Sequence, residues 1–195
     1  MKVDIKKVVF TGDSLIDNVW TADAFDVNYA RWTDIIAKEL EIEYVNTAIG
    51  GDTIDNISRN INDRILKYSP TLVIFDGGGN DVANGTAKTA EDAINDIVYI
   101  STVLQESGCD MIYIFFPVDW RNADMNNKYA GIKSGVKSSF NARGIKFLDM
   151  STTLGSVGNV KTSMFLDDRV HHNQKGQMVV AKKISEEIQN WFKVK

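Results

Sequence analysis

Cysteine is nearly absent from this sequence, in which Cys109 is the single example. One cysteine excludes any framework of disulfides within the chain. Cys109 lies between Gly108 and an apolar run from Met111 to Phe116. That setting predicts a buried structural thiol rather than a reactive one.

Long apolar runs are missing as well. The first ten residues contain only a three-residue apolar stretch, Val8 to Phe10, whereas a secretory signal requires about 7–15 such residues. No window approaches the roughly 20 apolar residues of a membrane-spanning helix. We therefore expect neither an export signal nor a membrane span, and a cytoplasmic location is the default expectation.

Charge of one sign is not concentrated anywhere. The net charge is −4 at pH 7, and the 22 Lys and Arg residues are scattered, which argues against nucleic acid or an anionic membrane as a partner. The chain has only two prolines and contains no repeat, linker or low-complexity tract. Its 195 residues, 44% of them hydrophobic, fit one domain spanning residues 1–195, and the oligomeric state stays open.

Short apolar runs alternate with amphipathic stretches along the whole chain. The runs are rich in Val, Ile and Phe, which is typical of buried strands in a parallel sheet. Apolar residues spaced by three or four predict helices between them, and alternation of this kind implies an α/β fold with helices on both faces of the sheet. The expected strands are Val8–Gly12, Tyr44–Thr47, Thr71–Phe75, Met111–Phe116 and Ile145–Met150; the expected helices cover about 32–40, 54–65, 93–104 and 180–191, and a less regular one covers 126–142, where Gly131 and Gly135 interrupt the pattern.

Polar segments that contain glycine or paired charges follow four of these strands. Ligands of a parallel sheet bind beyond the carboxyl ends of its strands, so these segments should meet at one edge. They are Gly12–Leu15, Asn46–Thr53, Gly77–Asp81 and, after a longer connection, Asp168–Asn173. This edge is where we expect a catalytic site.

Ser14 is the candidate nucleophile at that edge. A serine directly after a strand and a glycine can present its hydroxyl on a tight turn, although an isolated serine of this kind is more often a helix cap. The only histidines are His171 and His172. Asp168 lies three residues before His171, close enough to accept a hydrogen bond from Nδ1–H and leave Nε2 to take the proton of Ser14.

Two further groups can stabilise a tetrahedral oxyanion. Gly51 offers a backbone N–H that glycine allows a substrate to approach closely, and Asn80 offers its side-chain amide. The alternative interpretation is structural: Gly50 and Gly51 would form a turn before a helix, and Gly77–Gly79 would form a plain loop.

Taken in order, these segments resemble the sequence blocks of the GDSL, or SGNH, hydrolase family. The blocks are Gly12-Asp13-Ser14-Leu15, Gly51-Asp52-Thr53, Gly78-Gly79-Asn80-Asp81 and Asp168-x-x-His171, and the resemblance runs from Val8 to Gly176. It implies a flavodoxin-like three-layer α/β/α sandwich with a five-stranded parallel sheet in the order 2-1-3-4-5. It also implies ester hydrolysis through an acyl-enzyme, without a metal or another cofactor.

The resemblance assigns a role to each matching residue. It implies a catalytic triad of Ser14, His171 and Asp168, and an oxyanion hole made by the N–H of Ser14, the N–H of Gly51 and the side chain of Asn80. Three positions depart from the common pattern: Gly50 replaces a frequent Ser, Arg169 a frequent Gly and His172 a frequent Pro. These departures leave the shape of the last loop open, and with it the choice between the two histidines.

Two other classes of protein remain as alternatives. Gly12–Asp17 and Gly79–Asp81 faintly resemble elements of binuclear metallophosphoesterases, but such sites use several histidines and carboxylates, and this chain has only two adjacent histidines. A non-catalytic binding module on the same fold would be expected to lack an essential group, whereas here all of them are present.

The substrate is predicted from the two long loops that border the expected site. Residues 16–28 and 118–127 contain Trp20, Phe25 and Trp120 among many Asp, Asn and Arg side chains, and they have few aliphatic residues. Aromatic rings pack on sugar faces, and polar side chains bind hydroxyl groups. We therefore expect a short acyl group, the acetyl group, on a polar or carbohydrate alcohol, with Trp20 and Trp120 binding the substrate. The alternatives are a lipid esterase or acyl-thioesterase, and loops whose polar residues simply face water.

Overall fold

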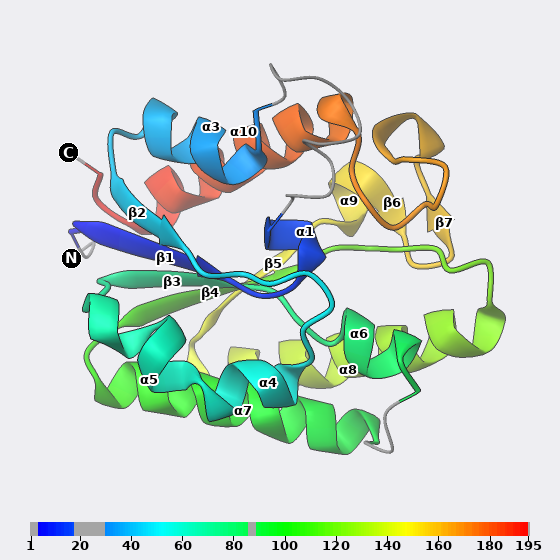
Figure 1. Ribbon diagram of the computed structural model, residues 1–195, viewed down its shortest axis with the longest axis horizontal. Helices are drawn as coiled ribbons and strands as arrows, with labels where there is room; N and C mark the ends of the chain where they lie inside the picture. The colour runs from blue at the N-terminus through cyan, green and yellow to red at the C-terminus, as the bar shows by residue number, and fades with distance from the viewer. Residues whose placement is uncertain (1–3, 18–29, 86–88, 195) are drawn as a thin grey trace.

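The computed structural model describes residues 4–17, 30–85 and 89–194. Its centre is a five-stranded parallel sheet in the order β2-β1-β3-β4-β5, as expected (Figure 1). Every strand begins and ends within one residue of its expected bounds. The strands are β1 (Lys7–Thr11), β2 (Glu43–Asn46), β3 (Leu72–Phe75), β4 (Asp110–Phe115) and β5 (Lys146–Asp149).

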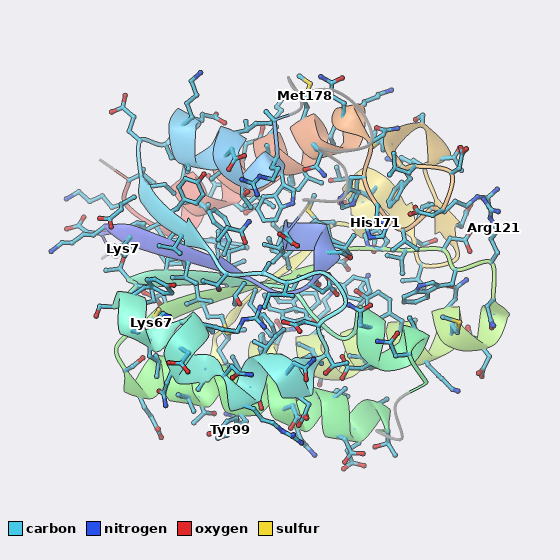
Figure 2. The ribbon with its side chains drawn as sticks, in the orientation of Figure 1. Lys7, Lys67, Tyr99, Arg121, His171 and Met178 are labelled. Carbon is cyan, nitrogen blue, oxygen red and sulfur yellow. The ribbon has the colours of Figure 1, made fainter. Side chains whose placement is uncertain are left out.

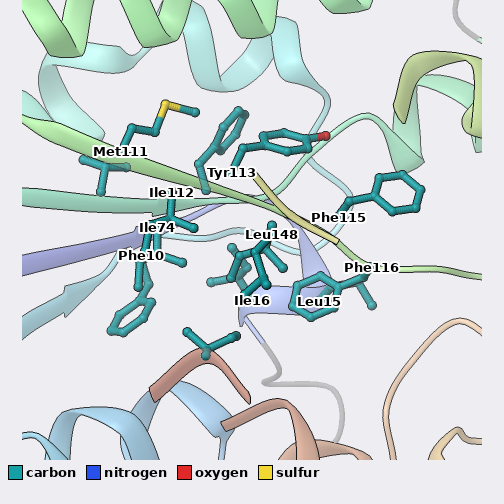
Figure 3. Close-up of a cluster of buried hydrophobic side chains, with 14 of the residues drawn as sticks. Phe10, Leu15, Ile16, Ile74, Met111, Ile112, Tyr113, Phe115, Phe116 and Leu148 are labelled. Carbon is teal, nitrogen blue, oxygen red and sulfur yellow. The ribbon is translucent and has the colours of Figure 1, made fainter. Parts of the chain in front are cut away.

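The middle residues of the central strands are apolar because helices cover both of their faces. All four residues of β3 are buried, whereas the edge strands β2 and β5 are partly exposed. Phe10 pairs with Ile74 across β1 and β3, and both side chains lie on the face opposite Tyr113 (Figure 3). Cys109 is also buried, and this confirms its structural role, since burial raises the pKa of its thiol to about 12.

Helices form a layer on each face of the sheet (Figure 1). One layer is α3 packed against α10; the other contains α4, α5, α7 and α8. The three-layer α/β/α sandwich is therefore confirmed. The bounds are α3 (Trp32–Glu39), α4 (Ile54–Arg59), α5 (Ile61–Arg64), α7 (Ala90–Glu106), α8 (Ala123–Arg143) and α10 (Gln174–Trp191).

The sequence did not predict the short elements. Three short helices follow strands directly, two 3-10 turns lie in connections, and a two-stranded hairpin precedes the last loop. They are α1 (Ser14–Asp17), α6 (Gly79–Ala83), α9 (Ser151–Leu154), η1 (Leu66–Tyr68), η2 (Thr162–Met164), β6 (Gly155–Ser156) and β7 (Asn159–Val160).

Helix α8 confirms the helix expected at 126–142 and extends it at both ends. Gly131 and Gly135 lie inside one continuous helix of 21 residues. The side chain of Asn122 accepts hydrogen bonds from the first turn, and Gly144, at φ +69°, ends the helix. A Cβ atom at Gly135 would collide with Ile94 of α7, so this glycine lets the two helices approach closely. The helix expected at 54–65 is not continuous, because the chain breaks at Asn60 into α4 and α5.

The start of β1 and the segment after α10 lie side by side at the end of the molecule away from α1 and α6 (Figure 1). Ile5 N–H donates to the carbonyl of Lys193, which joins the first described residues to the segment after α10. Within the described part of the chain, no helix has the length and apolar character needed to cross a membrane. At the other end of the molecule, the carboxyl ends of the strands form the edge where the loops with the candidate residues lie.

Candidate active site

Ser14 is placed by a tight turn at the end of β1. Gly12 adopts φ +152°, and a Cβ atom there would lie 2.5 Å from the carbonyl oxygen of Asp76, so only glycine fits. Asp13 accepts a hydrogen bond from Leu15 N–H at 2.9 Å through its side chain. Asp13, rather than Ser14, therefore caps α1, and the hydroxyl of Ser14 is left for another partner.

That partner is His171, which lies beside α1 (Figure 2). Nε2 of His171 is 2.9 Å from Oγ of Ser14, and Nδ1 is 2.6 Å from Oδ2 of Asp168. Two residues separated by 157 positions in the sequence thus meet at the sheet edge. In this arrangement the imidazole can accept the serine proton while the carboxylate holds its other nitrogen.

Asp168 is itself fixed by its own loop. Its Oδ1 accepts hydrogen bonds from the backbone N–H groups of Val170 at 2.8 Å and of His171 at 3.0 Å. Partial burial opposes ionisation of this carboxyl, but the hydrogen bonds from the His171 side chain and the two backbone groups lower its pKa to about 2. Asp168 is therefore a carboxylate at neutral pH.

His172 has a different environment. It is completely buried, and its ring contacts Phe116 and Phe165 at centroid distances of 5.1 and 5.0 Å. Burial, reinforced by the neighbouring His171, lowers the pKa of His172 to about 3, so its ring is neutral. The structure thus brings His171, and not His172, to Ser14.

Asn80 lies in the first turn of α6, and its amide is held on two sides. Its Nδ2 donates to the carbonyl of Asp52 at 3.0 Å and to Oδ2 of Asp13 at 3.3 Å. Gly51 lies one residue before Asp52 in a turn closed by the hydrogen bond from Asp52 N–H to Ile49, at 3.1 Å. Gly51 has φ +86° and open space on its Cβ side. The structure therefore brings the Gly51 loop against Asn80.

A group of buried acids behind Asn80 was missed by the sequence analysis. Burial raises the pKa of Asp13 to about 6, although the Leu15 N–H opposes the shift. Burial, and then the charge of Asp13, raise the pKa of Asp76 well above its ordinary value. Asp81 accepts a hydrogen bond from Ile54 N–H at 3.1 Å. Asp76 directly follows the fully apolar strand β3. An acidic residue at that position is the sequence signal that could have identified this group.

A cavity of about 250 Å³ opens directly over the Ser14 hydroxyl. Trp120 lines it and packs edge-on against Tyr129 at a centroid distance of 5.2 Å. Trp20, the other expected substrate-binding residue, lies outside the described residues. The lining residues are Asp13, Ser14, Leu15, Gly79, Asn80, Val118, Trp120, Tyr129, Asp168, Val170 and His171. Across residues 4–17, 30–85 and 89–194, no cluster of three or more His, Cys, Asp or Glu side chains is arranged to hold a metal ion.

A family model described as the GDSL-like lipase/acylhydrolase family matches residues 10–179. No curated protein matches the chain in sequence.

Solved structures with the same fold include three of bacterial hydrolases. A GDSL-like lipase from Bacteroides thetaiotaomicron is 18% identical, with a TM-score of 0.79 over 95% of this chain and 88% of that chain. A putative acylhydrolase from Bacteroides fragilis is 21% identical, with a TM-score of 0.77 over 95% and 87%. A catalytic mutant of an acetylxylan esterase from Geobacillus stearothermophilus is 18% identical, with a TM-score of 0.80 over 100% of both chains. At these identities the likeness concerns the fold.

Proposed function

The chain belongs to the GDSL-like lipase/acylhydrolase family, and from this premise we propose that it is a serine esterase that hydrolyses carboxylic esters through an acyl-enzyme. The observation that carries the proposal is the unbroken chain of hydrogen bonds from Ser14 through His171 to Asp168, at 2.9 and 2.6 Å. Nucleophile, base and orienting carboxylate then stand in the order that acyl transfer requires.

Each group has one task in the proposed reaction. Ser14 Oγ attacks the ester carbonyl while His171 Nε2 removes its proton, and the carboxylate of Asp168 stabilises the imidazolium that forms. The alcohol leaves with that proton. Water then attacks the acyl-enzyme, with His171 again acting as the base, and Ser14 is restored.

The oxyanion formed in both steps needs hydrogen-bond donors. We assign this task to the N–H of Ser14, the N–H of Gly51 and the amide of Asn80. The amide hydrogen of Asn80 that points at Asp13 makes the longer of its two bonds, 3.3 Å against 3.0 Å. We assign that hydrogen to the oxyanion, because its bond to Asp13 is the weaker one to give up.

Substitution of the nucleophile tests the proposal. Ser14→Ala should reduce the hydrolysis of p-nitrophenyl acetate by about 10⁴- to 10⁶-fold in kcat with an unchanged melting temperature. The matched control is Ser138→Ala, since Ser138 is exposed on α8. Wild-type protein should also be labelled at Ser14 by a fluorophosphonate. Retention of a tenth of the wild-type kcat/KM, or failure to label, would favour a binding module.

For the substrate, we propose a short acyl group on a polar or carbohydrate alcohol. The cavity of about 250 Å³ is smaller than the 300–1,000 Å³ of sites for drug-sized ligands. Trp120 and Tyr129 supply aromatic walls, while Asp13, Asn80 and Asp168 supply polar ones. One structure with the same fold is of an enzyme named an acetylxylan esterase.

The acyl preference can be measured with p-nitrophenyl esters from acetyl to octanoyl. An apolar tunnel would gain roughly 0.8 kcal/mol of binding for each methylene, so kcat/KM would rise along the series. The proposed site requires a fall beyond butyryl. A steady rise to octanoyl would instead indicate a lipid esterase or an acyl-thioesterase. Activity that a strong chelator abolishes would point to a metal-dependent hydrolase.

A further inference from the structure

The loop that carries Asp168 and His171 contains a strained residue at its centre. Arg169 adopts φ +59°, the left-handed region, which is strained for a residue with a Cβ but not for glycine. Its N–H donates to the carbonyl of Leu166 at 3.0 Å, and Leu166 N–H donates to the carbonyl of His171 at 2.8 Å. This turn lets the carboxylate of Asp168 reach both its own loop backbone and the imidazole.

Asp119 holds Arg169 at two points. The N–H of Asp119 donates to the carbonyl of Arg169 at 3.0 Å, and Oδ2 of Asp119 accepts from the Arg169 guanidinium at 3.0 Å. The Asp119 side chain is 7% exposed and that of Arg169 is 40% exposed. The carboxylate is therefore a fixed anchor, and the arginine reaches it from the surface.

The Asp119 carboxylate is held in place by residues that follow β4. Oδ1 of Asp119 accepts hydrogen bonds from Arg121 N–H at 2.9 Å and from Asn126 Nδ2 at 3.2 Å. Burial opposes ionisation of Asp119, but these bonds and the one from Arg169 lower the pKa of its carboxyl below the ordinary value. Arg121 adds a second link, since its guanidinium donates to the carbonyl of Asp167.

We propose that Asp119 is a positioning residue that keeps Arg169 left-handed and thereby holds Asp168 and His171 in register with Ser14. This inference rests on the proposed function of the triad. The family pattern often has glycine at the place of Arg169, and glycine would adopt this conformation unaided. Here the ion pair and the backbone hydrogen bond to Asp119 stabilise the left-handed conformation of a residue that has a side chain.

A pair of substitutions at Arg169 separates conformation from charge. Arg169→Ala and Arg169→Gly lose the same guanidinium, but only alanine keeps the Cβ that disfavours φ +59°. We expect Arg169→Ala to lower kcat for p-nitrophenyl acetate about 10- to 100-fold with little change in KM, as small misplacements of catalytic groups do. Arg169→Gly should stay close to wild type. Equal losses in the two variants would overturn the proposal.

A double-mutant cycle tests the part played by Asp119. Asp119→Ala should resemble Arg169→Ala, whereas in the Arg169→Gly background it should cause little further loss. The control is Asp124→Ala, which removes an exposed ion pair with Lys128 at the start of α8 and should leave kcat unchanged. A loss through Asp119→Ala that is the same in both backgrounds, or confined to KM, would contradict the proposal. If Asp119→Ala does not fold, the comparison at Arg169 still decides.

One measurement needs no substrate and so separates this inference from the proposed function. The proton between His171 Nδ1 and Asp168 should give a low-field NMR resonance, as expected for a bond of 2.6 Å. It should persist in Arg169→Gly and be lost or broadened in Arg169→Ala. Wild-type protein without esterase activity would refute the proposed function alone, whereas a resonance that is unchanged in Arg169→Ala would refute this inference.

Discussion

At the scale of single residues, two adjacent histidines differ completely in environment. His171 contacts Ser14 and Asp168, whereas His172 fills a space between two phenylalanine rings. The spacing from Asp168 favoured His171 as the base, but it gave no role to His172. What separates them is the direction in which each side chain leaves the loop.

Substitution of each histidine should therefore have a different consequence. His171→Ala should reduce kcat about as much as Ser14→Ala, because the members of a triad act as a unit. His172→Ala should lower the melting temperature, because it leaves a cavity in the core, and should keep most of the kcat at temperatures where the variant is folded. Steady-state kinetics and thermal melts of both variants provide the test. The reverse assignment would follow if His172→Ala were inactive while folded.

The amide of Asn80 gives a second residue-scale prediction. Asn80→Ala should lower kcat by about 10²- to 10³-fold with little change in KM, because an oxyanion donor acts mainly in the transition state. Initial rates over a range of substrate concentrations separate the two constants. A change confined to KM would make Asn80 a residue that binds the ground state instead.

At the scale of elements, helix α8 shows how a neighbour overrides local propensity. Glycine disfavours a helix, so Gly131 and Gly135 make the helical pattern at 126–142 less regular, yet α8 is continuous. At Gly135 the absent Cβ makes room for Ile94 of α7, whereas nothing lies within 4 Å of the Cβ position at Gly131. The two glycines therefore have different reasons to be there.

This difference can be measured with one substitution at each site. Gly131→Ala should stabilise the protein by about 0.5–1 kcal/mol, because alanine loses less backbone entropy in a helix. Gly135→Ala should be less stable than Gly131→Ala, because its Cβ must displace Ile94. Each kcal/mol corresponds to roughly 2–4 °C in melting temperature for a chain of this size. Equal melting temperatures of the two variants would show that Ile94 of α7 moves aside without a measurable loss of stability.

At the scale of the whole molecule, buried acids make stability depend on pH. Burial raises the pKa of Asp76 well above its ordinary value, and the side chain is 1% exposed. Well below the ordinary aspartate pKa of about 3.9 the carboxyl is protonated in both the folded and the unfolded chain, so its titration does not affect stability. As the pH rises, the unfolded chain ionises first, and the folded state loses free energy of unfolding.

Asp76→Asn should remove this dependence. The melting temperature of the variant relative to wild type should increase steadily from pH 4 to pH 8, because only the wild type must bury a carboxylate. Asp63→Asn is the matched control, since Asp63 is exposed on α5 and should show no such trend. A difference that is constant across this pH range would mean that the pKa of Asp76 in the folded protein is close to its ordinary value, and that its environment is wetter than its burial indicates.

The sequence by itself determined the architecture and proposed the reacting groups. Strand bounds could be predicted to within one residue because each strand contains a short apolar run that covers the sheet's core, and such a run is a local property of the sequence. Asp168 and His171 could be paired from the sequence alone because one loop holds both. The order of the strands came from the resemblance of whole blocks, and the topology confirms it.

Only the tertiary structure decided which side chains meet. The contact between Ser14 and His171, the burial of His172, and the bond from Asp119 to Arg169 each join segments that are far apart in the sequence or depend on where a side chain points. The short helices were missed for a related reason: at four or five residues they have too few hydrogen bonds to be stable alone, and packing selects them. The local sequence pattern limits which secondary structure a segment can form. The contacts that the segment makes in the folded protein decide which structure it adopts and which residues its side chains meet.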